Sequence, residues 1–225
     1  MGEFVTFWKG LDWTVLTGML MSIVPVLLCL TIHELAHGTV AYALGDDTAK
    51  RSGRLTLNPL RHIDPMGLVM MLVIRIGWAK PVPVDMGNFK RPKLDMAITA
   101  LAGPVSNFLL TASIFLFQVP LMRLNQGGGI GHEIAQMLIT TAVISAYLGV
   151  FNLMPIPPLD GSKIMFSFLR DNHYNWLMRF ERFGFIILMV LVWTGMLTGP
   201  LRDIMDGVVA WIAQLTFGPS TFLFS

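Results

Sequence analysis

The chain has 225 residues, of which 54% are hydrophobic and only 13% are charged, a composition typical of membrane proteins and unlike that of soluble domains. Lys and Arg total 16 against 14 for Asp and Glu, so the formal net charge of +2 is too small to indicate a nucleic acid or an acidic polymer as partner. The one cysteine, Cys29, excludes a disulfide within the chain.

Four uncharged apolar runs are long enough to cross a membrane, because a hydrocarbon core about 30 Å thick requires about 20 helical residues. We expect transmembrane helices at Trp13–Ile32, Met96–Met122, Ile134–Leu159 and Phe183–Leu201. A further apolar run, Gly207–Phe217, is shorter, and its reading stays open between a partial span, an interfacial helix and a packed terminal piece. The sequence therefore predicts an all-α polytopic membrane protein with four spans and a C-terminal helix.

A short apolar run, Met66–Ile74, lies between the first two of these helices. It is too short to span, and irregular backbone is tolerated at membrane depth only where protein surrounds it. Basic residues flank it on both sides, namely Lys50, Arg51, Arg54 and Arg61 before it and Lys80, Lys90, Arg91 and Lys93 after it. By the positive-inside rule both flanks are cytoplasmic, so we expect a re-entrant or interfacial element here.

Basic residues also orient the long helices. The segment 156–182 is basic, whereas the glycine-rich connection 123–133 carries a single arginine. We therefore expect the first helix to run from outside to inside and the 123–133 connection to be extracytoplasmic. No polar stretch is long enough to bury a core of its own, so we expect residues 1–225 to form one membrane-embedded domain in the cell membrane.

The strongest chemical signal lies at the end of the first helix. The sequence His33-Glu34-Leu35-Ala36-His37 is an H-E-x-x-H motif, and helical spacing places its two histidines one turn apart on one face. Two such imidazoles can share a zinc ion, while the glutamate acts as general base on a water molecule that zinc activates. The alternative is a pair of histidines without a metal. Ionisable groups are costly at membrane depth, which favours the metal site.

Residues 151–161 supply the second half of this site. Three prolines within four positions cannot continue an α-helix, so the third span must break near the cytoplasmic face. Asp160 follows the break and is suited to be the third zinc ligand, with the fourth position open for water or substrate. The alternative is that Asp160 only caps the next helix. This ligand set favours zinc but also suits iron, cobalt or nickel.

These motifs resemble the site-2 protease family of intramembrane zinc metalloproteases. The resemblance rests on HELAHG at 33–38 and NLMPIPPLDG at 152–161, with GRLTLNPLRHIDPMG at 53–67, GWAKPVPV at 77–84 and AGPVSN at 102–107 between them in the same order. It covers about residues 15–170, which leaves 171–225 for C-terminal helices. The length resembles that of the compact bacterial and archaeal members, without a PDZ module or a nucleotide-sensing domain.

The resemblance implies that His33, His37 and Asp160 bind one zinc ion per chain and that Glu34 activates the attacking water, near the cytoplasmic side. It also implies a transmembrane protein as substrate, whose helix must unwind locally because helical carbonyls are engaged in hydrogen bonds. The resemblance further implies short strands between the first two core helices, whose edge would be offered to the substrate. Access would be regulated by the helices themselves, by the segment from Arg202 onward or by a membrane partner.

Two asparagines are candidates for contacting the substrate. Asn152 lies eight residues before Asp160, and its amide can bind a substrate carbonyl or a developing oxyanion or tie two helices together. Asn107 has the same two options, and for it the structural option is favoured. His62 belongs to a motif as well, but a histidine in such a loop is more often bound by the loop backbone.

Two rival functions remain open. A non-proteolytic membrane metal-binding or transport protein would use the same ionisable residues as an ion site, although the two halves of the chain lack the matching broken segments that inverted-repeat transporters have. A catalytically idle family member that only binds its partners is the second rival. It is disfavoured because every expected catalytic residue is present.

Overall fold

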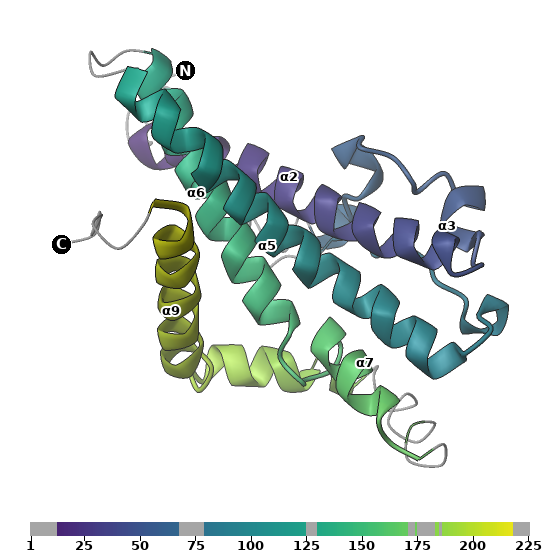
Figure 1. Ribbon diagram of the computed structural model, residues 1–225. Helices are drawn as coiled ribbons and strands as arrows, with labels where there is room; N and C mark the ends of the chain where they lie inside the picture. Colours follow the sequence, from purple (N-terminus) through teal and green to yellow (C-terminus); the bar gives the residue numbers. More distant parts are fainter. Residues whose placement is uncertain are drawn as a thin grey trace, which may run out of the picture.

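Helices of 31, 33 and 23 residues form the framework of the fold. The computed structural model describes residues 13–67, 79–124, 130–170, 174, 183–184 and 186–217. Its elements are α2 (Trp13–Ala43), α3 (Thr48–Arg51), the 3₁₀ helices η1 (Pro59–Arg61) and η2 (Met86–Asn88), α5 (Pro92–Leu124), α6 (Ile130–Asn152), α7 (Asp160–Ser167) and α9 (Thr198–Phe217) (Figure 1). Within these residues there is no strand, so the predicted all-α class is confirmed for them.

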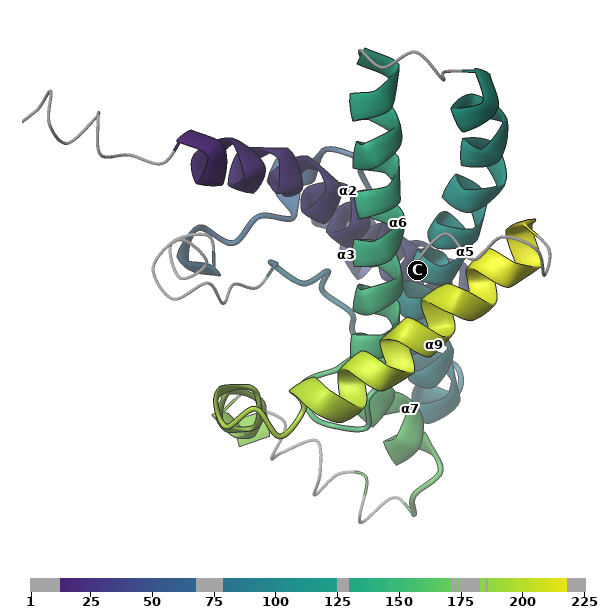
Figure 2. The same ribbon diagram turned by 90° about the vertical axis from the view of Figure 1, so that its left-hand side faces the viewer.

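Helix α5 is the centre of the bundle, because it packs against α2, α6, α7 and α9. Figure 2 shows α5 and α6 standing side by side, with α2 crossing them obliquely and α9 lying across both. Three helices of the described part are long and apolar enough to cross a membrane, over Ile23–Ala43, Pro92–Phe117 and Glu133–Asn152. They correspond to the first three predicted spans, and the chain is a multi-pass membrane protein.

Small and hydroxylated residues line the contact between α5 and α6. A Cβ atom on Gly149 would lie 3.1 Å from the ring of Phe108, so the glycine lets the two helices approach closely. The hydroxyls of Thr111 and Ser145 both donate to the main-chain carbonyl of Asn107 at 2.9 Å. Small residues and interhelical hydrogen bonds are the usual means by which helices associate in lipid.

Large apolar side chains point away from the bundle. The most exposed ones on the long helices include Leu109 at 63%, Leu116 at 60% and Phe117 at 74%. A soluble protein buries such residues, whereas a helix in a bilayer exposes them to the acyl chains. The exposure pattern therefore agrees with a lipid-embedded α5.

The third span ends before the prolines, as predicted. Helix α6 stops at Asn152 and not at Leu159, and residues 153–159 form a series of bends and turns before α7. Gly161 lies so close to this loop that a Cβ atom there would be 2.1 Å from the carbonyl oxygen of Leu153. On its other side, a Cβ atom on Gly184 would be 2.4 Å from the Cβ of Pro157. The loop is thus tightly held from two directions.

The prediction of one uninterrupted helix over Phe183–Leu201 is wrong. Residues 186–193 are helical, but a turn occupies 194–197, and α9 begins at Thr198. Gly195 in this turn has φ of +73°, a left-handed conformation that glycine adopts at little cost. The run contains no charge to mark the turn, which is why its length alone suggested a span.

The open segment Gly207–Phe217 is the second half of α9. This helix has 20 residues, but its first half carries Arg202, Asp203 and Asp206. It is not among the three candidate spans of the described residues. Pro200 is compatible with the start of α9, because the first turn of a helix has no acceptor for the missing N–H.

The predicted re-entrant element falls largely on residues 68–78, which lie outside the described part of the chain, and it stays a prediction. On either side of this gap, Ile63 and Ala79 form an isolated antiparallel bridge, and the N–H of Lys80 donates to the carbonyl of His62 at 2.9 Å. Ile63 and Ala79, on the two sides of the gap, therefore lie next to each other.

Candidate metal centre

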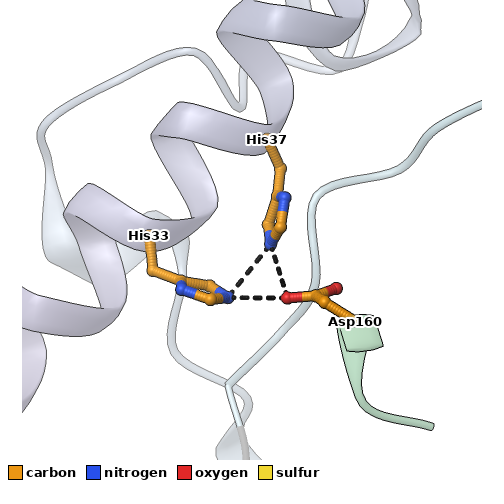
Figure 3. Close-up of side chains that lie close together, drawn as sticks. All are labelled: His33, His37 and Asp160. Atoms are coloured by element: carbon orange, nitrogen blue, oxygen red, sulfur yellow. Dashed lines mark hydrogen bonds and ion pairs between the residues drawn. The ribbon is translucent and has the colours of Figure 1, made fainter. Parts of the chain in front are cut away.

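Three predicted ligands from two distant parts of the sequence converge on one point. His33 and His37 lie one turn apart on α2, and Asp160 is the first residue of α7 (Figure 3). The two Nε2 atoms are 3.0 Å apart, and each lies 3.1 Å from Oδ2 of Asp160. All three residues are buried, with exposed fractions of 4%, 8% and 7%.

The imidazole of His37 is oriented by a main-chain carbonyl. Its Nδ1 lies 2.7 Å from the carbonyl oxygen of Thr99 on α5. A carbonyl only accepts, so Nδ1 carries the proton and Nε2 presents its lone pair to the other two side chains. This arrangement is the usual one for a histidine that binds a metal through Nε2.

The imidazole of His33 is oriented by the side chain of Asn107. The amide Nδ2 of Asn107 lies 3.0 Å from Nδ1 of His33, and Oδ1 has no hydrogen-bond partner in the described part of the chain. A half-turn of the amide exchanges these two atoms and lets Oδ1 accept the Nδ1 proton. In that orientation Nε2 of His33 also presents its lone pair to the cluster.

Asp160 has a partner on each carboxylate oxygen. Oδ2 faces the two histidines, and Oδ1 lies 3.7 Å from Nζ of Lys163. The N-cap residue of α7 is Leu159, and its cap has no side-chain hydrogen bond. Asp160 therefore faces the histidines and does not act as the cap.

Helix α5 supplies the floor of the cluster through a glycine. A Cβ atom on Gly103 would lie 2.4 Å from Nε2 of His37 and 2.5 Å from Cε1 of His33. No side chain other than hydrogen fits against the two rings. The AGPVSN segment thus contributes Gly103 as a close contact and Asn107 as a hydrogen-bonding partner, one turn apart on the same helix.

The donor set fits a metal ion. Ligand bonds of about 2.0–2.1 Å in a tetrahedral zinc site separate neighbouring ligand atoms by about 3.3 Å, close to the 3.0 Å and 3.1 Å edges observed. Two imidazole nitrogens and a carboxylate oxygen that point at one another in a buried place are suited to share a cation. In the described part of the chain these three residues form a group able to hold a metal ion.

Glu34 lies beside the cluster and is held by an extended segment. Its Oε2 accepts a hydrogen bond from the main-chain N–H of Val82 at 2.8 Å. Gly38, one turn further along α2, lets this segment pass, since a Cβ atom there would lie 3.1 Å from Cγ1 of Val82 and 2.6 Å from Cδ2 of Leu55. The chain around Val82 therefore runs against the face of α2 that carries Glu34.

The remaining candidates lie differently. The Nδ2 of Asn152 donates to the carbonyl of Leu148 at 2.9 Å, and no described contact joins it to the three ligands. His62 is buried, and its Nε2 lies 3.0 Å from the carbonyl oxygen of Thr56, as expected for a histidine bound by loop backbone. Sequence reasoning missed the contacts of Thr99 and Val82, because both act through main-chain atoms that any residue type has.

Comparison with known proteins gives a consistent result. A protein-family model described as "Peptidase family M50" matches residues 121–195 of this chain. Among the similar proteins are three whose names begin with "Putative zinc metalloprotease". YwhC of Bacillus subtilis is 40% identical over 172 residues, which are 75% of this chain and 78% of the relative. Rip2 of Mycobacterium tuberculosis is 30% identical over 205 residues, 87% of this chain and 74% of the relative.

The third relative, MJ0611 of Methanocaldococcus jannaschii, is 28% identical over 173 residues, 76% of this chain and 81% of the relative. No solved structure matches the chain at a significant level. The identity to YwhC extends over three quarters of both proteins, well beyond the length of a single motif. The chain belongs to peptidase family M50, the site-2 protease family.

Proposed function

We propose that this protein is an intramembrane zinc metalloprotease that hydrolyses peptide bonds in or near the transmembrane segments of other proteins. The observation that carries the proposal is the buried triangle of His33, His37 and Asp160 with Glu34 beside it. His33, Glu34 and His37 stand on α2, which is long and apolar enough to cross a membrane. The names of the relatives describe the same class of enzyme.

His33, His37 and Asp160 are the residues that would hold the metal. A zinc ion bound there polarises a carbonyl group and lowers the pKa of a water molecule towards about 7. The protein keeps both imidazoles in the metal-binding tautomer through Asn107 and the Thr99 carbonyl. Their fixed orientation means that little reorganisation is required when the metal binds.

Glu34 is the general base. It accepts a proton from the attacking water and then donates it to the amine that leaves, which is the role of the glutamate in H-E-x-x-H proteases. The Val82 N–H fixes one carboxylate oxygen at 2.8 Å, so the other oxygen remains to take the proton. Asn107 acts in this proposal on His33, and Asn152 stays a candidate for contacting the substrate carbonyl.

The substrate must reach this site in extended form, because a helix engages its carbonyls in hydrogen bonds. A shallow apolar cavity of about 330 Å³, open to the outside of the bundle, lies between α2, α6 and α9 and is lined by Val26, Leu30, Ile144, Tyr147, Leu148, Phe151 and Met205. Leu30 precedes His33 by one helical turn. We propose that this cavity receives apolar side chains of the substrate next to the site of cleavage.

The positive-inside rule places the site near the cytoplasmic face of the cell membrane. Basic residues lie on α3 (Lys50 and Arg51), on η1 (Arg61) and at the start of α5 (Lys93). These elements belong to the connection between α2 and α5, and His33 and His37 lie in the part of α2 that leads into it. Regulation then acts on α9 or through a membrane partner.

The test is cleavage of a model transmembrane substrate by the purified protein and by the variant Glu34→Gln, with zinc measured in both. We expect about one zinc per chain in each protein and cleavage by the unmodified protein alone. Equal cleavage by both proteins would contradict the role of Glu34. Zinc transport into vesicles without any cleavage would support the rival transport function.

A further inference from the structure

A fully buried carboxylate outside the metal centre ties together two segments that lie far apart in the sequence. Asp46 follows the end of α2 and has an exposed fraction of 0%. Its Oδ2 accepts the main-chain N–H of Asp85 at 2.8 Å. Its Oδ1 accepts the Nδ2 of Asn88 at 2.8 Å, the main-chain N–H of Thr48 at 3.1 Å and the Thr48 hydroxyl.

These bonds hold the Asp46 side chain in one position. A buried carboxylate is costly unless hydrogen bonds replace its hydration, and here four donors do so. Burial raises the pKa of the Asp46 carboxyl. The bonds from Thr48, Asn88 and Asp85 together lower this pKa by more than burial raises it, so the net shift is downward. The ionised carboxylate is therefore the form that the surrounding donors stabilise.

The segment that Asp46 holds is the one that contacts Glu34. Val82 donates its N–H to Glu34 three residues before Asp85 donates to Asp46. Between these two points the chain has no helix or strand of its own. Beyond them, Phe89 is buried in a cluster with Ala41 and Met96. Val84 and Met86 pack against the same cluster, and the bond from the Asp85 N–H to Asp46 is the polar contact nearest to the Val82 amide on this segment.

We propose that Asp46 is a positioning residue for catalysis, which keeps the segment 82–88 against α2 so that the Val82 N–H remains on Glu34. This inference rests on the proposed protease function. The described contacts of Asp46 do not include the three ligands, and it acts through the main chain of residues 82–85. Loss of the contact frees the Glu34 carboxylate to turn, without disturbing His33, His37 or Asp160.

The variant Asp46→Asn tests the proposal with almost no change in volume. An asparagine oxygen can replace Oδ1 towards Thr48 and Asn88, but its Nδ2 then faces the N–H of Asp85, so two donors oppose each other. Of the two bonds that join Asp46 to the 82–88 segment, the one from the Asp85 N–H is lost and the one from Asn88 is kept. The neighbouring variant Asp47→Asn is the matched control, because Asp47 is exposed and pairs with Arg51 on the surface.

Both variants are compared with the unmodified full-length protein in detergent. We expect Asp46→Asn to retain its zinc and its KM for a model transmembrane substrate, while kcat falls about tenfold. Hydrogen–deuterium exchange of a peptide covering 79–89 should be about tenfold faster than in the unmodified protein. Asp47→Asn should match the unmodified protein in all four measurements.

A second variant guards against a folding defect. Asn88→Ala removes one donor from Asp46 at an exposed position, and we expect a smaller loss of kcat, about threefold, with faster exchange of the same peptide. Unchanged kcat or unchanged exchange in the folded variants would overturn the proposal, as would a loss of kcat that follows loss of zinc. An inactive unmodified protein would overturn the protease function itself, whereas active protein with unaffected variants overturns only the role of Asp46.

Discussion

The side chain of Asn107 on α5 lies 3.0 Å from Nδ1 of His33 on α2, although 74 residues separate them in the sequence. Asn107 is also completely buried. A group that holds the outer nitrogen of a metal-binding histidine determines which nitrogen carries the proton and how the ring is turned. This contact therefore links the AGPVSN segment to the chemistry of the H-E-x-x-H motif.

Replacing Asn107 by Leu should weaken zinc binding. The leucine has a similar volume but no polar atom, so the Nδ1 of His33 is left buried without a partner. We expect the affinity for zinc to fall by about 10- to 100-fold, as measured by competition with a coloured chelator. Ser106→Ala is a suitable control, since the Ser106 hydroxyl donates only to the Gly103 carbonyl within α5. Equal affinities in all three proteins would refute this role.

Gly103→Ala should remove the metal and the activity together. The added methyl group would lie 2.4–2.5 Å from both imidazoles, much closer than the van der Waals contact distance of about 3.5–4.0 Å, so the rings must move. Metal analysis of the purified variant checks this expectation. Gly199→Ala serves as the control, because a Cβ atom there meets nothing within 4 Å among the residues that the structure describes. A Gly103→Ala protein with a full complement of zinc would show that the rings tolerate displacement.

The contribution of Asp46 to stability should disappear in acid. The pKa of Asp46 in the folded protein lies below its ordinary value of 3.8, so the unfolded chain binds a proton at higher pH than the folded one does. Its contribution is therefore complete well above pH 3.8 and is lost as the pH falls through the folded pKa.

The difference in Tm between the unmodified protein and Asp46→Asn measures this contribution, because asparagine does not titrate. We expect the difference to be constant near neutral pH and to shrink in acid. The nearby carboxylates of Asp47 and Asp85 bind Arg51 and the Gly87 N–H, and they are present in both proteins. A difference that grows towards low pH would contradict the downward pKa shift.

Much of the site was predictable because the candidate ligands and the candidate general base are side chains of recognisable residue types. His33 and His37 lie on one face as long as the first helix continues through them. The prolines before Asp160 show that the preceding helix, α6, must stop before them. The contacts that orient these residues were less accessible. The Thr99 carbonyl and the Val82 N–H are main-chain groups, and the proximity of Gly103 to the rings depends on how α5 packs against α2.

The fold was predictable to the same degree. Long uncharged runs indicated α2, α5 and α6, because lipid requires an apolar surface on every side of a helix. That same uniformity conceals a turn within a run, and so the break at Gly195 was missed. The available signals were Gly195 and the pair Gly199-Pro200. Glycine is frequent where a helix ends and proline where a helix begins, so together they indicate a break in this run.

The most direct test of the central claim is mass spectrometry of the products formed from a model transmembrane substrate in water enriched in ¹⁸O. The account predicts a cut within or at the edge of the transmembrane segment, with one ¹⁸O atom in the new carboxyl terminus. It also predicts that a zinc chelator abolishes the cut and that added zinc restores it. Cleavage that persists after removal of the metal, or that falls only in soluble loops, would contradict the account.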